Sequence, residues 1–218
     1  MKKVLALTAL AVASTSAFAS SSYVTGNVQF HDSYLHGAKQ TSTLEAGHTF
    51  DSNTTLLVEF DGIPLGKLDP SKESAPTPFT TLGVEQVFNI SDNLWVAAGY
   101  HHLINNGETF QYRPLVKIGY NFDNGLSLSN RTRQHIQADD TRNNETRLDN
   151  KIAYSFSDQP LALSYNNVYV IKQGDADNSM DHELRATWTR SGVQPYLEYR
   201  NQANNENNAL VFGASYGF

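Results

Sequence analysis

The 218-residue chain contains no cysteine, so a disulfide framework cannot stabilise it. Beyond its first 19 residues, no stretch approaches the roughly 20 apolar residues of a membrane-spanning helix, which excludes a helical membrane protein. Apolar residues make up 39% of the chain, and its mean hydropathy is −0.44. These values fit a soluble secreted β-protein. They equally fit a transmembrane β-barrel, because half of each barrel strand faces a polar interior.

The first residues have the parts of a secretory signal peptide. A basic start at Lys2 and Lys3 precedes an apolar run, and an Ala-Phe-Ala sequence that ends at Ala19 resembles a cleavage site. The apolar run is too short to anchor the chain in a bilayer. We therefore expect residues 1–19 to be a cleaved signal peptide and residues 20–218 to be the exported protein.

Apolar and polar residues alternate through the rest of the chain. Near its end, Leu210, Phe212, Tyr216 and Phe218 share one face, with small residues between them. A period of two indicates a β-strand with one apolar face. Twelve such segments have about ten residues each, the length that a tilted strand needs to cross a bilayer. They cover 22–33, 40–50, 54–63, 79–89, 94–104, 111–122, 126–137, 145–156, 161–172, 180–189, 193–202 and 208–218.

The connections between these segments alternate in length. Short turn sequences occupy 51–53, 91–93, 123–125, 157–160 and 191–192, and longer polar stretches occupy 66–78, 138–144, 173–179 and 203–207. This alternation predicts an all-β fold: one antiparallel transmembrane β-barrel of 12 strands, with short periplasmic turns, longer extracellular loops and both termini on the periplasmic side. A soluble β-sandwich gives no reason for such regular alternation.

Aromatic residues gather just before the short turns. An aromatic girdle at the periplasmic membrane surface belongs at this level of an outer-membrane barrel. The residues are Phe50, Phe88, Tyr120, Phe122, Tyr154, Phe156, Tyr216 and Phe218. We predict that their side chains face lipid.

Arginine is absent from the first 112 residues and occurs eight times after them. The alternation places many of these arginines, with several lysines, on the inner face of the barrel. Guanidinium groups along a water-filled channel offer repeated bidentate sites for carboxylates, phosphates or sulfates. When these sites are closely spaced, an anion can move from one to the next without binding too tightly at any of them. The predicted pore-lining, substrate-binding residues are Arg113, Lys117, Arg131, Arg133, Arg147, Lys151, Arg185, Arg200 and Tyr196, the last as a platform on which a sugar ring stacks.

Inward-facing acids give these cations an alternative role. If the acids pair with the cations, the charges mainly maintain the shape of the barrel. If they do not, an acidic wall faces a basic wall and an electric field runs across the pore. The acids are Asp149, Asp181, Glu183 and Glu198 in the arginine-containing half, and Glu45, Glu59, Asp61 and Glu85 in the other. The sequence leaves both possibilities open.

The second half of the chain resembles a known family. The stretches YRPLVKIGYNFDNGLSLSNRTRQ (112–134) and VQPYLEYRNQ (193–202), with the terminal FGASYGF, are similar to the small oligogalacturonate-specific porins of Gram-negative outer membranes, the KdgM/NanC family. The resemblance implies a twelve-stranded barrel in which inward basic residues guide acidic oligosaccharides. Carried over by position, that role falls on Arg113, Lys117, Arg131, Arg133 and Arg147, and further on Lys151, Arg185 and Arg200. The inward acids of the first half depart from the family's two facing basic tracks, so the identity of the sugar stays open.

An outer-membrane hydrolase is an alternative function. The residue types at the outer rim of a barrel protease are matched by Asp139 and Asp140 with the pair Asp181 and His182. Those of a barrel phospholipase are matched by His101 and His102 with Ser129. Such residues are common in polar segments, so the pattern favours a protein that is not an enzyme. A general small-solute porin and a plugged adhesive barrel are the remaining alternatives.

Residues 175–186 begin like a calcium-binding loop, but Met180 replaces its glycine and Ala186 its bidentate acid. We therefore predict no metal, and we expect no cofactor and no nucleic-acid partner. The predicted function is passive diffusion of acidic oligosaccharides, such as oligogalacturonate, another uronate or a sialic-acid sugar. The expected location is the Gram-negative outer membrane, where a monomeric barrel is surrounded by lipid.

Overall fold

Twelve antiparallel strands close into a single barrel in the computed structural model. The structure describes residues 20–35, 37–71, 76–202, 204 and 206–218, so the predicted signal peptide lies outside the described residues. The strands are β1 (Ser21–Leu35), β2 (Ala38–Thr49), β3 (Thr54–Pro64), β4 (Phe79–Asn89), β5 (Leu94–Asn105), β6 (Glu108–Asn121), β7 (Leu126–Gln137), β8 (Glu145–Ser155), β9 (Leu161–Lys172), β10 (Ser179–Trp188), β11 (Gln194–Gln202) and β12 (Asn207–Gly217). Each strand pairs with its neighbours in the sequence, which confirms the predicted fold class.

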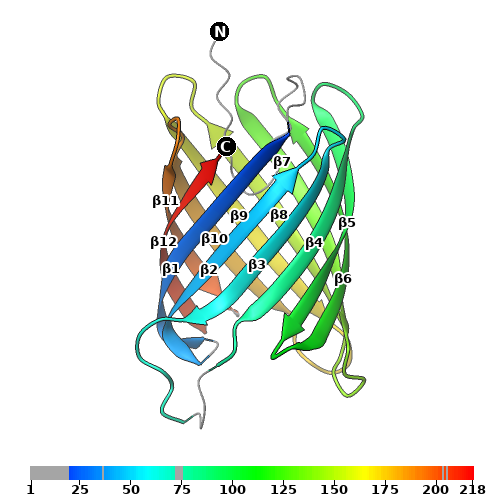
Figure 1. Cartoon of the computed structure of the whole chain (residues 1–218), viewed down its shortest axis with the longest axis vertical. Coiled ribbons are helices and arrows are strands. Elements are labelled where there is room, and N and C mark those ends of the chain that lie inside the picture. The colour runs from blue at the N-terminus through cyan, green and yellow to red at the C-terminus, as the bar shows by residue number, and fades with distance from the viewer. Residues whose placement is uncertain (1–19, 36, 72–75, 203, 205) are drawn as a thin grey trace.

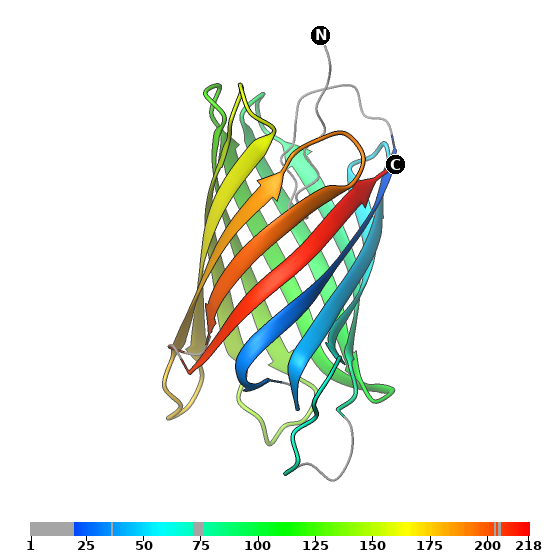
Figure 2. The same ribbon diagram turned by 90° about the vertical axis from the view of Figure 1, so that its left-hand side faces the viewer.

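The barrel closes where β1 pairs with β12. Tyr23 lies opposite Gly217, and the backbones of Ser22 and Phe218 exchange two hydrogen bonds of 2.8 and 2.9 Å. The start of β1 and the end of β12 therefore lie at the same end of the barrel (Figure 1). All strands are tilted relative to the barrel axis, as closure of a sheet requires (Figure 2). Antiparallel closure between the first and last strand needs an even strand number, which the twelve strands supply.

The two ends of the barrel differ in their connections. The end that carries the turns 50–53, 90–93, 122–125, 156–160 and 189–193 is called the turn end, and the opposite end the loop end. The loop end carries the longer connections 65–78, 138–144 and 173–178, as the sequence predicted. Two pairs of strands meet there more closely in sequence than expected: β2 begins at Ala38 soon after β1 ends at Leu35, and a second tight connection is the hairpin at 106–107. At the second, Asn106 and Gly107 have φ angles of 52° and 79°, the conformation of a two-residue hairpin turn, and this lets β5 and β6 extend further than the alternation indicated.

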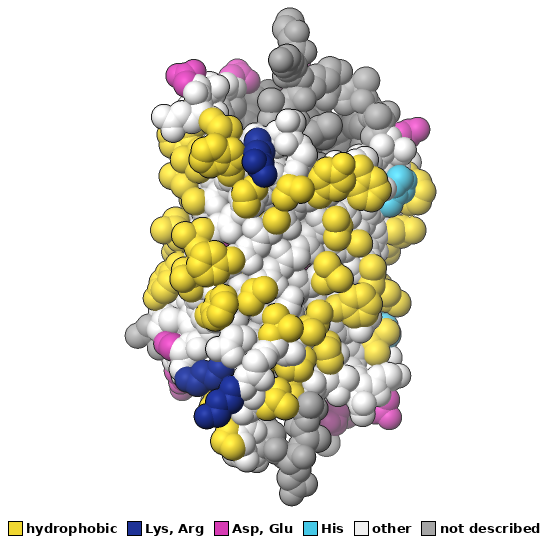
Figure 3. Space-filling model, turned by 60° about the vertical axis from the view of Figure 1, so that its left-hand side comes forward, with side chains coloured by type: hydrophobic (Ala, Val, Ile, Leu, Met, Phe, Trp, Pro, Cys, Tyr) yellow, Lys and Arg dark blue, Asp and Glu magenta, His cyan; other side chains and the backbone are white. Residues whose placement is uncertain are grey.

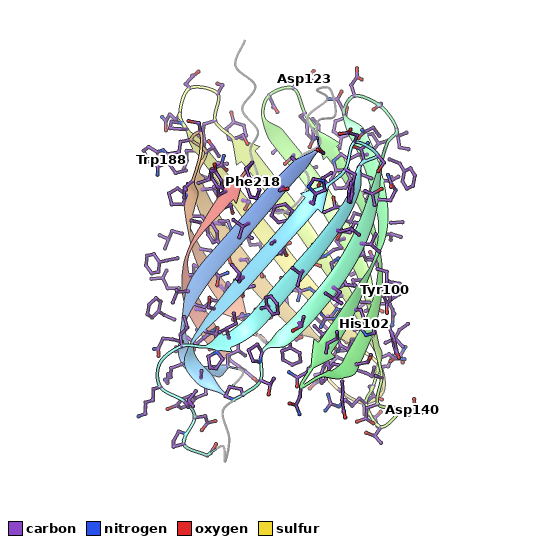
Figure 4. The ribbon with its side chains drawn as sticks, viewed as in Figure 1. Tyr100, His102, Asp123, Asp140, Trp188 and Phe218 are labelled. Atoms are coloured by element: carbon purple, nitrogen blue, oxygen red, sulfur yellow. The ribbon has the colours of Figure 1, made fainter. Side chains whose placement is uncertain are left out.

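The outer surface of the barrel is mostly apolar between its two ends. In Figure 3, hydrophobic side chains cover much of the wall, and the charged side chains visible there lie near the ends. All eight aromatic residues predicted for the girdle are exposed on this surface, from Phe156 at 36% to Phe218 at 71%. Trp188 also points away from the barrel, while Asp123 and Asp140 lie at its opposite ends (Figure 4). Among the described residues, no helix is long and apolar enough to span a membrane.

Inward-facing aromatic rings lie flat against the wall because glycine leaves room for them. A Cβ atom added to Gly47 would lie 2.5 Å from the Tyr23 ring, and one added to Gly119 would lie 2.3 Å from the Trp95 ring. The glycines therefore allow large rings on the neighbouring strands to occupy little of the interior. Because these rings lie against the wall, the rest of the interior is left to polar side chains.

Candidate functional site

A cavity of about 630 Å³ occupies the interior of the barrel, with lining residues from β1 to β11. Eight of the nine predicted pore residues line it: Arg113, Arg131, Arg133, Arg147, Lys151, Arg185, Arg200 and Tyr196. The ninth, Lys117, is the direct cross-strand partner of Arg131 and forms an ion pair beside the cavity. The structure thus brings the predicted basic residues together inside the barrel.

Two buried carboxylates hold four of the arginines in pairs. The Asp149 carboxylate, from β8, accepts a hydrogen bond of 2.9 Å from Arg131 and one of 2.8 Å from Arg147. On β11, Glu198 accepts bonds of 2.5 Å from Arg185 and from Arg200. Only 2% of Glu198 is exposed. Because the partners of these four guanidinium groups are fixed, their hydrogen bonds mainly organise the wall.

Glu85 holds another cation in the same way. Its carboxylate pairs with the ammonium group of Lys117 and, at 2.9 Å, with Nε2 of His101. Of the two possibilities that the sequence left open, pairing with inward acids holds for Lys117 and for the four arginines above. For these five cations the acids supply the counter-charge that a partly buried cation needs.

Three cations on the cavity wall have no carboxylate partner among the described residues. The Nε–H group of Arg113 donates a hydrogen bond to the side-chain oxygen of Gln111, with an N–O distance of 2.6 Å. The Nε–H group of Arg133 donates to Nε2 of His135, with an N–N distance of 2.9 Å. For the Lys151 ammonium group, the described part of the chain provides no hydrogen-bond or ion-pair partner. All three side chains line the cavity, so their positive charges are available to an anionic ligand. We call Arg113, Arg133 and Lys151 the unpaired cations.

Three acids on the opposite wall are bonded to neutral groups instead of cations. Glu45 accepts a hydrogen bond of 2.8 Å from the hydroxyl group of Tyr23. Glu59 and Asp61, on β3, accept bonds of 3.3 and 2.6 Å from threonine hydroxyl groups. Glu45 and Glu59 are direct cross-strand partners, and all three acids line the cavity. The cavity therefore has an acidic wall on β2 and β3 and the unpaired cations on β6 to β8.

Tyr196 has a different environment from the one expected for a sugar-stacking residue. Only 7% of it is exposed, and a Cβ atom on Gly213 would lie 2.2 Å from its ring. The guanidinium group of Arg185 lies over the ring, 4.1 Å from its centroid, in a cation–π contact. A sugar can stack on Tyr196 only after Arg185 moves away. In this structure Tyr196 supports Arg185.

The interior also contains polar residues that the sequence analysis did not name. Asn27, Thr43, Ser164 and Asn166 line the cavity. Asn166 donates a hydrogen bond of 2.9 Å to Glu183, and its side-chain oxygen is buried without a partner among the described residues. The alternation could have placed these residues inside, but uncharged polar residues gave no signal that distinguishes a lining from a loop.

Two histidines that suggested hydrolases face away from the interior of the barrel. His102 faces outward from β5 (Figure 4), where its Nδ1 lies 3.0 Å from the Tyr100 hydroxyl group. Ser129 belongs to the inward face of β7, in register with Lys151. His182 also faces outward, with Nδ1 2.7 Å from the Tyr165 hydroxyl group. In the described ranges, no group of three or more His, Cys, Asp or Glu residues is placed to hold a metal ion.

Solved structures of porins have the same fold as this chain. The solved structure of the KdgM porin matches with a TM-score of 0.69 and 17% identity, over 90% of this chain and 99% of that one. The NanC porin matches with a TM-score of 0.71 and 16% identity, over 88% and 98%. Another structure with the same scores as the first is described as KdgM porin in complex with disordered oligogalacturonate. At these identities the structures show the common fold.

Sequence comparison gives the family. No curated protein sequence matches the chain. A family model does match, over residues 15–210, and it describes the oligogalacturonate-specific porin protein KdgM. Because this match covers most of the chain and the barrel agrees with the solved structures, the chain belongs to the KdgM family of oligogalacturonate-specific porins of the outer membrane.

Proposed function

We propose that this porin admits acidic oligosaccharides by passive diffusion and that the unpaired cations Arg113, Arg133 and Lys151 are their main contacts. The family model supports a uronate substrate, since it describes oligogalacturonate-specific porins. The observation that carries the proposal is that these three cations line the cavity without carboxylate partners among the described residues. A guanidinium group binds a sugar carboxylate through two hydrogen bonds, and an ammonium group attracts it as a point charge.

The paired cations have a second role in this proposal. Arg131, Arg147, Arg185 and Arg200 hold the two buried carboxylates in place and keep the wall rigid, so they contribute to binding mainly through their long-range field. Of the nine substrate-binding residues predicted from the sequence, three are the principal contacts in this proposal. No covalent step is part of this function, and the gradient of the sugar drives its passage.

A variant without the unpaired cations tests the proposal. Arg113→Gln, Arg133→Gln and Lys151→Gln are combined, and the reversal potential across a planar bilayer is measured in a salt gradient. We expect the preference for anions to fall several-fold and liposome swelling with oligogalacturonate to slow. The matched control is the charge-balanced pair Lys117→Gln with Glu85→Gln, which releases no arginine and should leave the reversal potential almost unchanged. An unchanged preference in the triple variant would refute the assignment of these contacts.

Swelling assays with several sugars distinguish the alternative functions. A porin for acidic sugars admits oligogalacturonate, alginate oligomers or sialic acid faster than neutral oligosaccharides of equal size. A general small-solute porin admits both classes at similar rates, and a plugged adhesive barrel admits neither. The cavity of about 630 Å³ favours an open interior over a plug. We also propose that residues 1–19 are removed on export, which the N-terminal sequence of the mature protein tests.

A further inference from the structure

The two arginines among the unpaired cations are each held at Nε by an uncharged side chain on the same strand. On β6 the acceptor for Arg113 is Gln111, and on β7 the acceptor for Arg133 is His135. Residues two apart on a strand face the same side, so each acceptor lies beside its arginine on the inner wall. Both acceptors are buried, with 5% of Gln111 and 6% of His135 exposed. We call Gln111 and His135 the neutral acceptors.

Two of the paired arginines are held with the same spacing, but by acids. Asp149 accepts a hydrogen bond from Nε of Arg147, and Glu198 accepts one from Nε of Arg200, again two residues away on one strand. In these pairs the group that orients the guanidinium group also neutralises its charge. The neutral acceptors orient their arginines and leave the positive charge in place.

The neutral acceptors lie on the loop-end side of their arginines. Strand β6 begins at the loop end, so Gln111 comes before Arg113 on the way into the barrel. Strand β7 runs toward the loop end, so His135 is nearer to that end than Arg133. The acids that hold the two paired arginines lie on the turn-end side instead. The Nε–H bonds therefore direct Arg113 and Arg133 toward the end from which an extracellular sugar enters.

His135 is held in the form that accepts a hydrogen bond. Its Nδ1 lies 3.4 Å from a carboxylate oxygen of Glu145, its direct cross-strand partner on β8. A neutral imidazole donates from one ring nitrogen and accepts at the other. When Nδ1 carries the proton and donates to Glu145, Nε2 has a free lone pair for the Nε–H group of Arg133. Glu145 thus orients the ring that orients Arg133.

Each guanidinium group held in this way keeps its terminal N–H groups for a ligand. A guanidinium group has several N–H donors, and the neutral acceptor uses only the one on Nε. The terminal nitrogens of Arg113 and Arg133 have no hydrogen-bond partner in the described part of the chain, and both residues line the cavity. Two parallel N–H groups match the two oxygens of a carboxylate. An arginine that is fixed in advance loses less conformational entropy on binding than one that rotates freely.

We propose that Gln111 and His135 are positioning residues that set the affinity for acidic sugars without changing the charge of the pore. The inference rests on the proposed function, in which Arg113 and Arg133 bind carboxylates of the sugar. Selectivity between small ions follows the charge of the wall, whereas recognition of a sugar carboxylate also requires fixed donor geometry. Loss of a neutral acceptor should therefore weaken sugar binding and leave small-ion selectivity nearly unchanged. Replacement of a neutral acceptor by an acid should reduce both.

Current block by oligogalacturonate and the reversal potential in a salt gradient measure these two properties in the same planar bilayer. Gln111→Met and His135→Leu remove the acceptor. We expect each to raise the half-blocking concentration of oligogalacturonate about tenfold, as for one lost hydrogen bond to a charged group, at a nearly native reversal potential. Gln111→Glu pairs with Arg113 and should also shift the reversal potential toward the cation value. Heat-dependent mobility on gels checks that each variant is folded.

A conservative variant provides the rescue. In His135→Gln the amide oxygen accepts from Arg133 and the amide nitrogen donates to Glu145, so we expect a half-blocking concentration within about threefold of the native value. The control is Gln134→Met on the lipid-facing side of β7, where Gln134 accepts a hydrogen bond of 2.8 Å from Thr146. It should leave both readings unchanged.

Three results would overturn the positioning role. The first is native sugar block in both Gln111→Met and His135→Leu, and the second is equal loss in His135→Leu and His135→Gln. The third is a native reversal potential in Gln111→Glu, which retains an acceptor and so tests the role even where Gln111→Met fails to fold.

The triple variant of the unpaired cations separates this inference from the proposed function. Native anion preference and native sugar block in the triple variant would show that the proposed function itself is wrong. Loss of both in the triple variant, with native sugar block in Gln111→Met and His135→Leu, would refute only the positioning role.

Discussion

Arg133 and Arg147 are direct cross-strand partners on β7 and β8, so two guanidinium groups are neighbours inside the barrel. Arg147 is bonded to Asp149, whereas Arg133 bonds to the neutral acceptor His135. Like charges directly opposite each other destabilise a strand pair. The barrel keeps this unfavourable pair at the cavity wall. A basic group that is retained at a cost to stability is expected at a site that binds anions.

Replacement of Arg133 by glutamine should stabilise the barrel and reduce its preference for anions. Removal of the repulsion from Arg147 should raise the free energy of unfolding by about 0.2–1 kcal/mol. Reversible unfolding in lipid vesicles measures the stability, and planar-bilayer reversal potentials measure the preference. Lower stability together with unchanged selectivity would contradict the role given to Arg133.

Replacement of Asp149 by asparagine should have the opposite effects. Arg131 and Arg147 both lose their carboxylate, while the shape of the side chain is preserved. Loss of a buried ion-pair partner costs about 3–5 kcal/mol, and water in the cavity should reduce this to roughly 2 kcal/mol. The two released cations should increase anion preference in the same bilayer recordings. A variant that binds acidic sugars no better would show that these arginines do not reach the ligand.

The acidic wall should limit the preference for anions. Glu59→Gln combined with Asp61→Asn removes two negative charges from the wall that faces Arg113. We expect the reversal potential to shift further toward the anion value, because the repulsion of anions from β3 disappears. Glu206→Gln, in the connection between β11 and β12, is the control and should produce a much smaller shift. Equal shifts would mean that overall charge, and not the cavity wall, determines selectivity.

Substitution of Gly119 by alanine should disturb the interior near Trp95. The added Cβ would lie 2.3 Å from the indole ring, so the ring must move, at a cost of about 1–3 kcal/mol. The emission spectrum of Trp95, recorded with Trp188 replaced by phenylalanine, reports the movement. Gly26→Ala on β1 is the control, because its Cβ finds neighbours no closer than 3.5 Å. Unaltered emission and stability in the Gly119 variant would contradict this packing.

The amino-acid sequence alone predicted the strands and the side of the wall to which each residue belongs. Alternation with a period of two assigned Arg131 and Glu59 to the interior and Tyr154 to the exterior, because neighbouring side chains of a strand must point to opposite faces. The distribution of arginine along the chain likewise indicated a basic half of the barrel. The hairpin at 106–107 was missed, because its turn residues lie within a polar stretch that resembles a longer loop.

Only the tertiary structure decided which of these residues meet. That Asp149 on β8 meets Arg131 on β7, while Lys151 stays unpaired, depends on the register between strands. The same register aligns Asn150 with Asn167 on the outer wall. Alternation within a strand fixes the face of each side chain, but it carries no information on how far the neighbouring strand is shifted. That shift is set when all twelve strands close into one barrel.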